Sequence, residues 1–136
     1  MRARTDDTHD RALRSWVVSA NESGCDFPVQ NLPLGVFRVA GSAAGARIGV
    51  AIGDRVLDLR HCHEASLFDD PALGEACAEP VMNALLALGR ERWRDLRRQV
   101  SAWLRVEAPA GVRQALDAAL IERRTVDMHL PARIGD

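Results

Sequence analysis

Hydrophobic residues alternate with small or polar ones along residues 47–59, RIGVAIGDRVLDL, and this period of two predicts a pair of short strands. Gly53–Asp54 separates the two strands, and glycine at the first position suits a type II′ hairpin turn. The resulting register pairs Ile52 with Arg55, Val50 with Leu57 and Ile48 with Leu59. One face of the hairpin is then apolar, and a shift of one residue would turn that face to solvent. We therefore expect the apolar face to lie buried in a sheet.

The preceding segment, Asp26 to Phe37, is apolar but is interrupted by Pro28 and Pro33. Each proline lacks a backbone N–H and favours an extended residue before it, so the segment fits neither a helix nor a central strand. We predict a buried, irregular strap (residues 26–37) that enters a strand at Gly35. The Asn31 amide is expected to bond another strand or a second domain, because the residue two positions on is a proline. The apolar residues of the strap are Phe27, Leu32, Leu34, Val36 and Phe37.

Residues 1–13 are polar and are expected to form a disordered tail. Residues 14–126 are then one domain, beginning with a short strand over Ser15 to Val18. Residues 127–136 are expected to be an extended linker, marked by Leu130–Pro131.

From Pro80 onward the apolar period becomes that of a helix, with Pro80 at a first helical position. Gly89 is expected to cap or kink this run, so that it divides a short helix from a longer one. Before this run, residues 60–79 form a connection with a short helical turn near 61–68, and Asp69–Asp70–Pro71 is typical of a helix or turn start. A last helix is predicted over Val112 to Glu122. These patterns predict an α+β or mainly β fold with helices packed over a small, bent sheet.

The 136-residue chain has one domain's worth of sequence and a net charge of −1, and its 18 basic residues are all arginine. This balance gives no reason to expect nucleic acid or an anionic membrane as a partner. The sequence has neither a secretory signal nor an apolar stretch long enough to span a bilayer, and its three cysteines have no metal-type spacing. We expect a cytoplasmic protein with reduced thiols.

Two clusters of residues could carry chemistry. His61–Cys62–His63–Glu64 resembles a set of metal ligands, but no second pair lies at zinc spacing, and an exposed polar turn is the favoured interpretation. Asp127 and His129 could serve with Cys25 or Ser19 as orienter, base and nucleophile. Because no sequence signature brings these residues together, packing of the neighbouring apolar side chains is favoured there as well.

The run DFPVQNLPLGVF followed by RIGVAIGDRVLDL resembles the N-terminal domain of the fumarylacetoacetase family. Three later pieces fit the same order: LLALGRERW (85–93), MHLP (128–131) and IGD (134–136). The resemblance assigns a structural motif to Phe27, Pro28, Asn31, Leu32, Pro33, Gly35, Phe37, Gly53 and Asp54. It assigns a linker toward a catalytic domain to Met128, His129, Leu130 and Pro131.

This resemblance implies a small SH3-like barrel with a helical insertion and C-terminal helices. It also implies that the chain is part of an enzyme that hydrolyses a carbon–carbon bond of fumarylacetoacetate during tyrosine and phenylalanine catabolism. In that family, a divalent Ca or Mg ion and a His–Glu pair belong to the C-terminal domain, and the first metal-binding carboxylate follows the IGD motif. No catalytic residue, metal ligand or cofactor is therefore assigned to this chain.

Two hypotheses remain open. The chain could be the structural or regulatory domain that partners a catalytic domain on the same or an adjacent polypeptide, with a homodimer possible. Alternatively, it could be a freestanding, non-catalytic interaction module. When the catalytic domain is absent, we expect Phe27, Leu32 and Leu34, together with Met128 and Leu130, to leave a partly exposed apolar patch.

Overall fold

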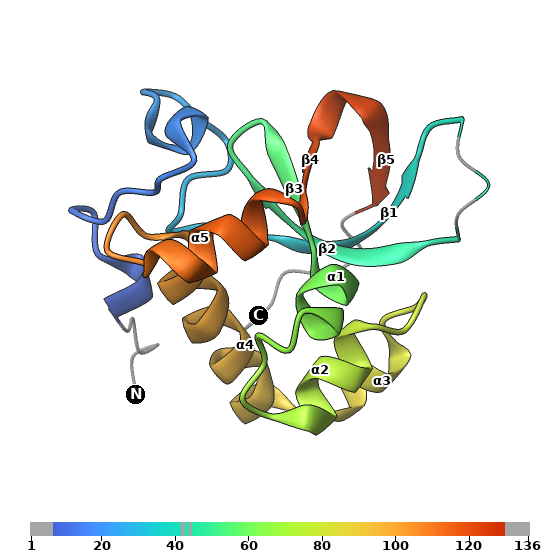
Figure 1. Ribbon diagram of the computed structural model, residues 1–136. Helices are drawn as coiled ribbons and strands as arrows, with labels where there is room; N and C mark the ends of the chain where they lie inside the picture. Colours follow the sequence, from blue (N-terminus) through green and yellow to red (C-terminus); the bar gives the residue numbers. More distant parts are fainter. Residues whose placement is uncertain (1–6, 42, 44, 130–136) are drawn as a thin grey trace.

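The structure is a computed structural model that describes residues 7–41, 43 and 45–129 (Figure 1). Its centre is a five-stranded antiparallel sheet with the order β4-β3-β2-β1-β5. The strands are β1 (Leu34–Val39), β2 (Arg47–Ile52), β3 (Arg55–Asp58), β4 (Leu120–Glu122) and β5 (Val126–His129). The helices are α1 (Leu59–Glu64), α2 (Pro71–Cys77), α3 (Asn83–Ala87), α4 (Arg90–Leu104) and α5 (Ala110–Asp117), and 3-10 turns lie at η1 (Asp7–His9), η2 (Val18–Asn21) and η3 (Arg123–Thr125).

The predicted hairpin is confirmed as β2 and β3. Ile52 pairs with Arg55 and Val50 with Leu57, as the alternation predicts. The third predicted pair, Ile48 with Leu59, is wrong because β3 ends at Asp58. The Asp58 carboxylate caps the first turn of α1, and Leu59 is already helical, although it is buried as expected.

The helical run is confirmed around α4 and corrected at both ends. Gly89 has a φ of +89° and separates α3 from α4, as expected. Pro80 begins no helix, whereas Pro71 occupies the first turn of α2 behind the N-cap Asp70. The predicted helix Val112 to Glu122 instead ends at Asp117, and its last residues form β4 beside β3.

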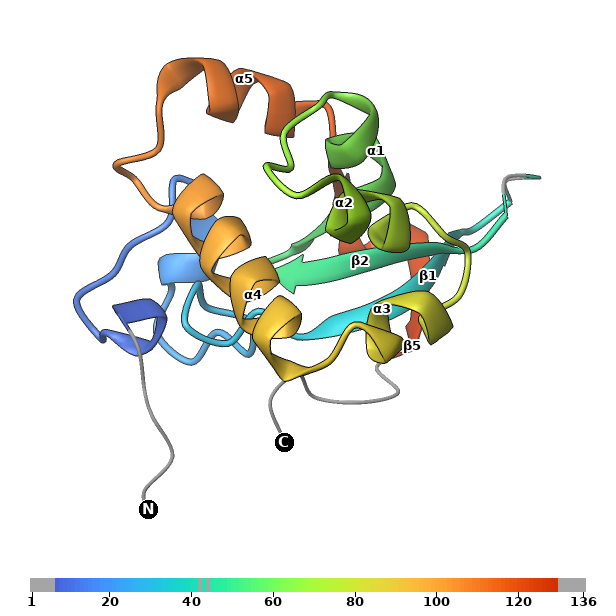
Figure 2. The same cartoon turned by 90° about the horizontal axis from the view of Figure 1, so that it is seen from below.

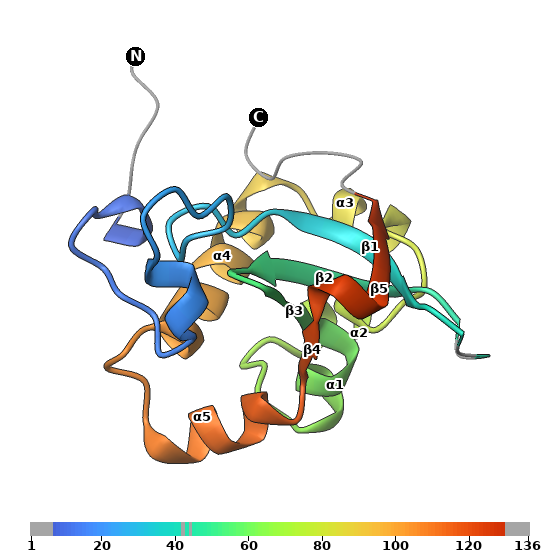
Figure 3. The ribbon, with the colours of Figure 1, turned by 90° about the horizontal axis from the view of Figure 1, so that it is seen from above.

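The helices cover one face of the sheet, seen from below in Figure 2, while the arch formed by β4, η3 and β5 rises on the opposite face in Figures 1 and 3. The main core lies between the sheet and the helices and includes Leu34, Ile48, Val50, Leu57, Leu73, Leu96 and Leu104. Alternate residues on the other sheet face, Phe37, Ala51 and Val56, are at most 1% exposed. The arch therefore encloses a second, smaller apolar cluster.

The fold class is α+β, but within the described residues the sheet is not closed. β4 and β5 are its two edges and do not pair with each other. The SH3-like barrel implied by the resemblance is therefore not confirmed.

The N-terminal region differs from expectation. Residues 15–18 form no strand, because Ser15 makes an isolated bridge to Arg105 and the chain then enters η2. Within the expected tail 1–13, residues 7–13 include η1, and Thr8 is fully buried. Among the described residues, no helix combines the length and hydropathy needed to cross a bilayer.

Candidate functional site

The Gly53–Asp54 turn is held by three segments that are distant in sequence. Phe27 O in the strap accepts a hydrogen bond from Gly53 N at 2.7 Å, and Asp54 O accepts one from Arg123 N at 2.8 Å. The third segment is η2, whose Ser19 hydroxyl accepts a bond from Asp54 N at 3.0 Å. The turn therefore joins the strap, η2 and the β4–η3 arch.

Gly53 is required at this junction. Its φ is +55°, and a Cβ at position 53 would approach Ser19 Oγ to 2.2 Å. Leu32 and Ser66 are the described non-glycine residues with positive φ, so the φ of Asp54 is negative. A negative φ at the second turn position excludes a type I′ turn and supports the predicted type II′ turn.

The Asp54 carboxylate is exposed but has a defined partner. Ser19 Oγ donates to Asp54 Oδ1 at 2.7 Å. This hydrogen bond, more than the nearby Arg55 guanidinium, lowers the pKa of Asp54 below its usual 3.8 and outweighs the opposing effect of burial.

The strap crosses the molecule beside this turn. Phe27 is half-buried beneath the Arg123 guanidinium, whose central carbon lies 4.7 Å from the ring centroid. Asn31 bonds neither another strand nor a second domain among the described residues; its amide donates to Asp26 O at 2.9 Å within the strap itself. The strap therefore satisfies this amide locally, which corrects the expectation.

Arg97 of α4 fixes the strap from the helix side. Its Nε donates to Thr8 Oγ1 and one terminal nitrogen donates to Asn31 O, both at 2.9 Å, while the other terminal nitrogen bonds Gln30 O. The sequence does not single out Arg97, because it is one of several arginines interleaved with acidic residues on the same helix. Bonds to main-chain carbonyls leave no pattern in a sequence.

The expected apolar patch on the strap does not form, because Leu32 and Leu34 are 3% and 1% exposed. Both lie in the main core. Because Pro28 and Pro33 have no backbone N–H, the strap can enter the core with fewer unpaired backbone N–H groups. Met128 and Phe27 are partly exposed, and Leu130 lies outside the described residues.

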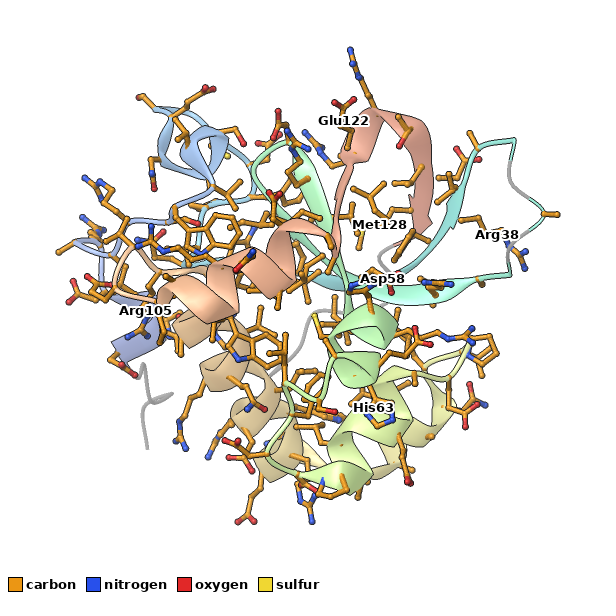
Figure 4. All side chains as sticks on the ribbon, viewed as in Figure 1. Arg38, Asp58, His63, Arg105, Glu122 and Met128 are labelled. Carbon is orange, nitrogen blue, oxygen red and sulfur yellow. The ribbon has the colours of Figure 1, made fainter. Side chains whose placement is uncertain are left out.

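The second apolar cluster depends on Gly49. A Cβ there would lie 2.7 Å from both Phe37 Cε1 and Val56 Cγ1. Met128 pairs with Phe37 across β1 and β5 and is half-buried on the same sheet face, and it lies between β4 and β5 in Figure 4. The expected linker residues 127–129 thus belong to an edge strand.

Asp58 is the buried acid at the start of α1 (Figure 4). Its Oδ1 accepts from Arg60 N and His61 N, and its Oδ2 pairs with the Arg47 guanidinium at 2.5 Å. The Asp58 and Arg47 side chains are 5% and 30% exposed. This pair links the hairpin to the helical layer, and its role was missed because Asp58 was interpreted as an ordinary strand residue.

His61 and His63 lie on α1 and not in an exposed turn, and both are half-buried. Burial raises the pKa values of the Cys62 and Cys77 thiols to about 12, which makes both thiols unreactive at neutral pH. Across residues 7–41, 43 and 45–129, no three His, Cys, Asp or Glu side chains lie close enough together to hold a metal ion. In this part of the chain, Asp127 and Ser19 belong to different parts of the fold, β5 and η2.

The remaining motif residues have structural surroundings. Gly35 is buried in β1, Pro28 and Pro33 are half-buried, and Pro33 O accepts from Ala51 N at 3.0 Å. Leu130 and Pro131 lie outside the described residues. The surface has two open depressions. A groove of about 630 Å³ lies between α4, α5 and the 66–73 region, away from the motif, and a polar pocket of about 570 Å³ at the hairpin turn is lined by Asp54, Glu122, Arg123 and Arg124.

Comparison with known proteins places these elements in context. The family described as fumarylacetoacetase N-terminal matches residues 30–131. Fumarylacetoacetases of Caenorhabditis elegans and Homo sapiens are each 38% identical to the chain over 129 and 128 residues, which is 91% and 90% of this chain. The fumarylacetoacetase of Oryza sativa subsp. japonica is 37% identical over 130 residues. The chain spans about 30% of the length of these relatives.

Proposed function

Because the chain belongs to the fumarylacetoacetase N-terminal family, we propose that it serves as the non-catalytic domain of a fumarylacetoacetase-like hydrolase. The whole enzyme would cleave fumarylacetoacetate with water to give fumarate and acetoacetate, in the cytoplasmic breakdown of tyrosine and phenylalanine. Another part of the same polypeptide, or an adjacent polypeptide, would carry the catalytic groups. We also propose that the complete assembly forms a homodimer.

The observation that carries this proposal is the extent of the match. About 90% of the chain aligns with each of these relatives, but the aligned part is 29–30% of the relative. The chain thus matches one portion of these longer relatives. We therefore propose that it works as one part of a larger enzyme.

The contacts of the motif residues support a scaffold role. Arg97 donates a hydrogen bond to the strap, and Ser19 and Arg123 bond the hairpin turn. In the second apolar cluster, the Phe37 ring packs against Gly49. The Phe27, Phe37 and Asp54 side chains contact other segments of the chain, whereas the Asn31 amide bonds within the strap. We therefore propose that these residues keep a docking surface in shape and do not touch substrate. We further propose that the curved sheet with its arch is an open form of the SH3-like barrel.

A divalent metal, Ca or Mg, is proposed for the catalytic part of the assembly, where it would stabilise negative charge developing on the substrate. The described residues of this chain do not fit such an ion, since they contain no suitable group of carboxylates or imidazoles. No step of the reaction is assigned to them.

The proposal can be tested with a chimera in which this chain replaces the matched N-terminal portion of the human relative. Loss of fumarylacetoacetate absorbance is followed with added magnesium or calcium, beside the isolated 136-residue chain. We expect turnover by the chimera and none by the isolated chain. Turnover by the isolated chain that survives chelation would overturn the non-catalytic role, and a folded but inactive chimera would favour a freestanding interaction module.

A further inference from the structure

The outer edge of β5 presents main-chain hydrogen-bonding groups. Ala40 N donates to Thr125 O at 2.9 Å, so this pair is a hydrogen-bonded pair of the β1–β5 ladder. Such pairs alternate along an antiparallel ladder, and the next one is Arg38 with Asp127. The N–H and C=O of Met128 therefore point away from β1.

The neighbouring donor is already used, because Val126 N–H bonds Arg123 O at the end of η3. This leaves the Met128 N–H and C=O and the Val126 C=O on the outer edge. No strand among the described residues pairs with this edge of the sheet.

β5 lacks several of the usual protections of an edge strand, although it is only four residues long. Its sequence, VDMH, contains no proline, lysine or arginine, whereas natural edges are commonly blocked by such residues or by bulges. Val126 and Met128 pair with Val39 and Phe37, so their half-buried side chains extend the second apolar cluster to the edge. An added strand would find both main-chain partners and apolar neighbours there.

We propose that β5 is the docking edge for the polypeptide that carries the catalytic groups, which adds a strand to the sheet beside Met128. This inference rests on the proposed function. The family match runs through β5 to residue 131, and the relatives contain much additional chain. A catalytic part that continued from residue 131 would be tethered close to this edge, which would give it a high effective concentration there. A second copy of this chain is the competing occupant.

The direct measurement is hydrogen exchange of the Met128 amide, because this N–H is the donor that would change partners. It is compared in the isolated chain and in the chimera with the human relative. We expect exchange at least about tenfold slower in the chimera. The Asp127 amide faces β1 and is the internal control, since it should be protected in both.

Variants at the same position separate the main chain from the side chain. Met128→Pro removes the outward donor at a site where an edge strand tolerates proline, while Met128→Ala keeps the donor and shortens the side chain. We expect the proline variant of the isolated chain to retain its thermal midpoint, and the proline variant of the chimera to lose at least about tenfold in activity relative to the alanine variant. If the proline variant fails to fold, the exchange of the unmodified Met128 amide still decides the question.

The possible failures are distinguishable. An active chimera whose Met128 amide exchanges as fast as in the isolated chain overturns edge pairing and leaves the proposed function intact. A folded, inactive chimera with a protected Met128 amide supports edge pairing and counts against the proposed catalytic assembly. Protection in the isolated chain overturns the inference: if it increases with concentration, a second copy occupies the edge, and if it does not, the chain covers the edge itself.

Discussion

The ring of Phe37 on β1 lies against Gly49 on β2, at the point where a Cβ would come within 2.7 Å of Phe37 Cε1. The two residues do not pair in the ladder, since Gly49 pairs with Gly35, but they share the sheet face beneath the arch. The ring is 1% exposed because it fills the space that a side chain at position 49 would occupy. Glycine at this position is therefore a packing requirement.

Gly49→Ala should lower the free energy of unfolding by about 1–3 kcal/mol, because the added methyl overpacks the cluster between Phe37 and Val56. Urea unfolding followed by tryptophan fluorescence measures the change. Gly111→Ala is the matched control, since nothing lies within 4 Å of its Cβ position, and it should be neutral or slightly stabilising. Equal effects of the two substitutions would contradict this packing.

Asp58→Ala should cost about 2–4 kcal/mol, because it removes the partner of Arg47 and the cap of α1 together. The loss stays below that of a fully buried pair because Arg47 can still reach water. Asp58→Asn keeps an oxygen acceptor for the helix N–H groups and should cost less, about 1–2 kcal/mol. Denaturant midpoints that rank the two variants in the opposite order would argue against the double role.

Arg97→Ala should destabilise the chain by about 1–3 kcal/mol and speed amide exchange in the strap, since three hydrogen bonds to Thr8, Gln30 and Asn31 are lost. Arg97→Lys should not restore them, because an ammonium lacks the planar fork of a guanidinium. Arg94→Ala, on the exposed side of the same helix, is the control and should change stability by less than about 0.5 kcal/mol. A strap whose exchange is unaffected by Arg97→Ala would not be anchored by this helix.

Ser19→Ala should raise the pKa of Asp54 toward 3.8, since the Ser19 hydrogen bond is the main cause of its lowered value. A carboxyl whose folded pKa is lowered stabilises the fold above its unfolded pKa, and this contribution is lost as the pH falls through the folded pKa. The stability that Ser19 contributes through Asp54 is therefore lost at pH values at and below 3.8. Carbon-detected NMR titration of the Asp54 carboxyl measures the shift, and Ser23→Ala should leave it unchanged.

Cys62 and Cys77 should react far more slowly than Cys25 with a thiol reagent at pH 8. Both are fully buried with pKa values raised to about 12, whereas Cys25 is partly exposed. Counting thiols modified by a chromogenic disulfide should give one in the native chain and three in denaturant. Rapid modification of all three in the native chain would show that α1 and α2 open readily.

The hairpin register could be predicted because side-chain alternation and a turn glycine are both local signals. The helix at Val112 to Glu122 was overextended because Leu120 and Ile121 fit a helical period as well as a strand, and only their pairing with β3 decides. The buried strap could be predicted from its apolar residues, but the expected exposed patch at Leu32 and Leu34 was wrong, because their exposure depends on how the rest of the core packs against the strap. Asp58 and Arg97 were missed for the same reason: their partners are main-chain groups and a distant arginine.

The clamped turn also bears on how the chain acquires its structure. The β2–β3 hairpin is local and can form on the microsecond scale, before the rest of the sheet. Its turn is secured only when Ser19 and Phe27 from one side and Arg123 from the other have arrived. Contacts between segments so far apart slow folding, since a long loop must close before they form. During synthesis the hairpin turn can therefore bond only Ser19 and Phe27 at first, because both precede it in the chain. The contact from Arg123 forms after β4 and η3 have been synthesised.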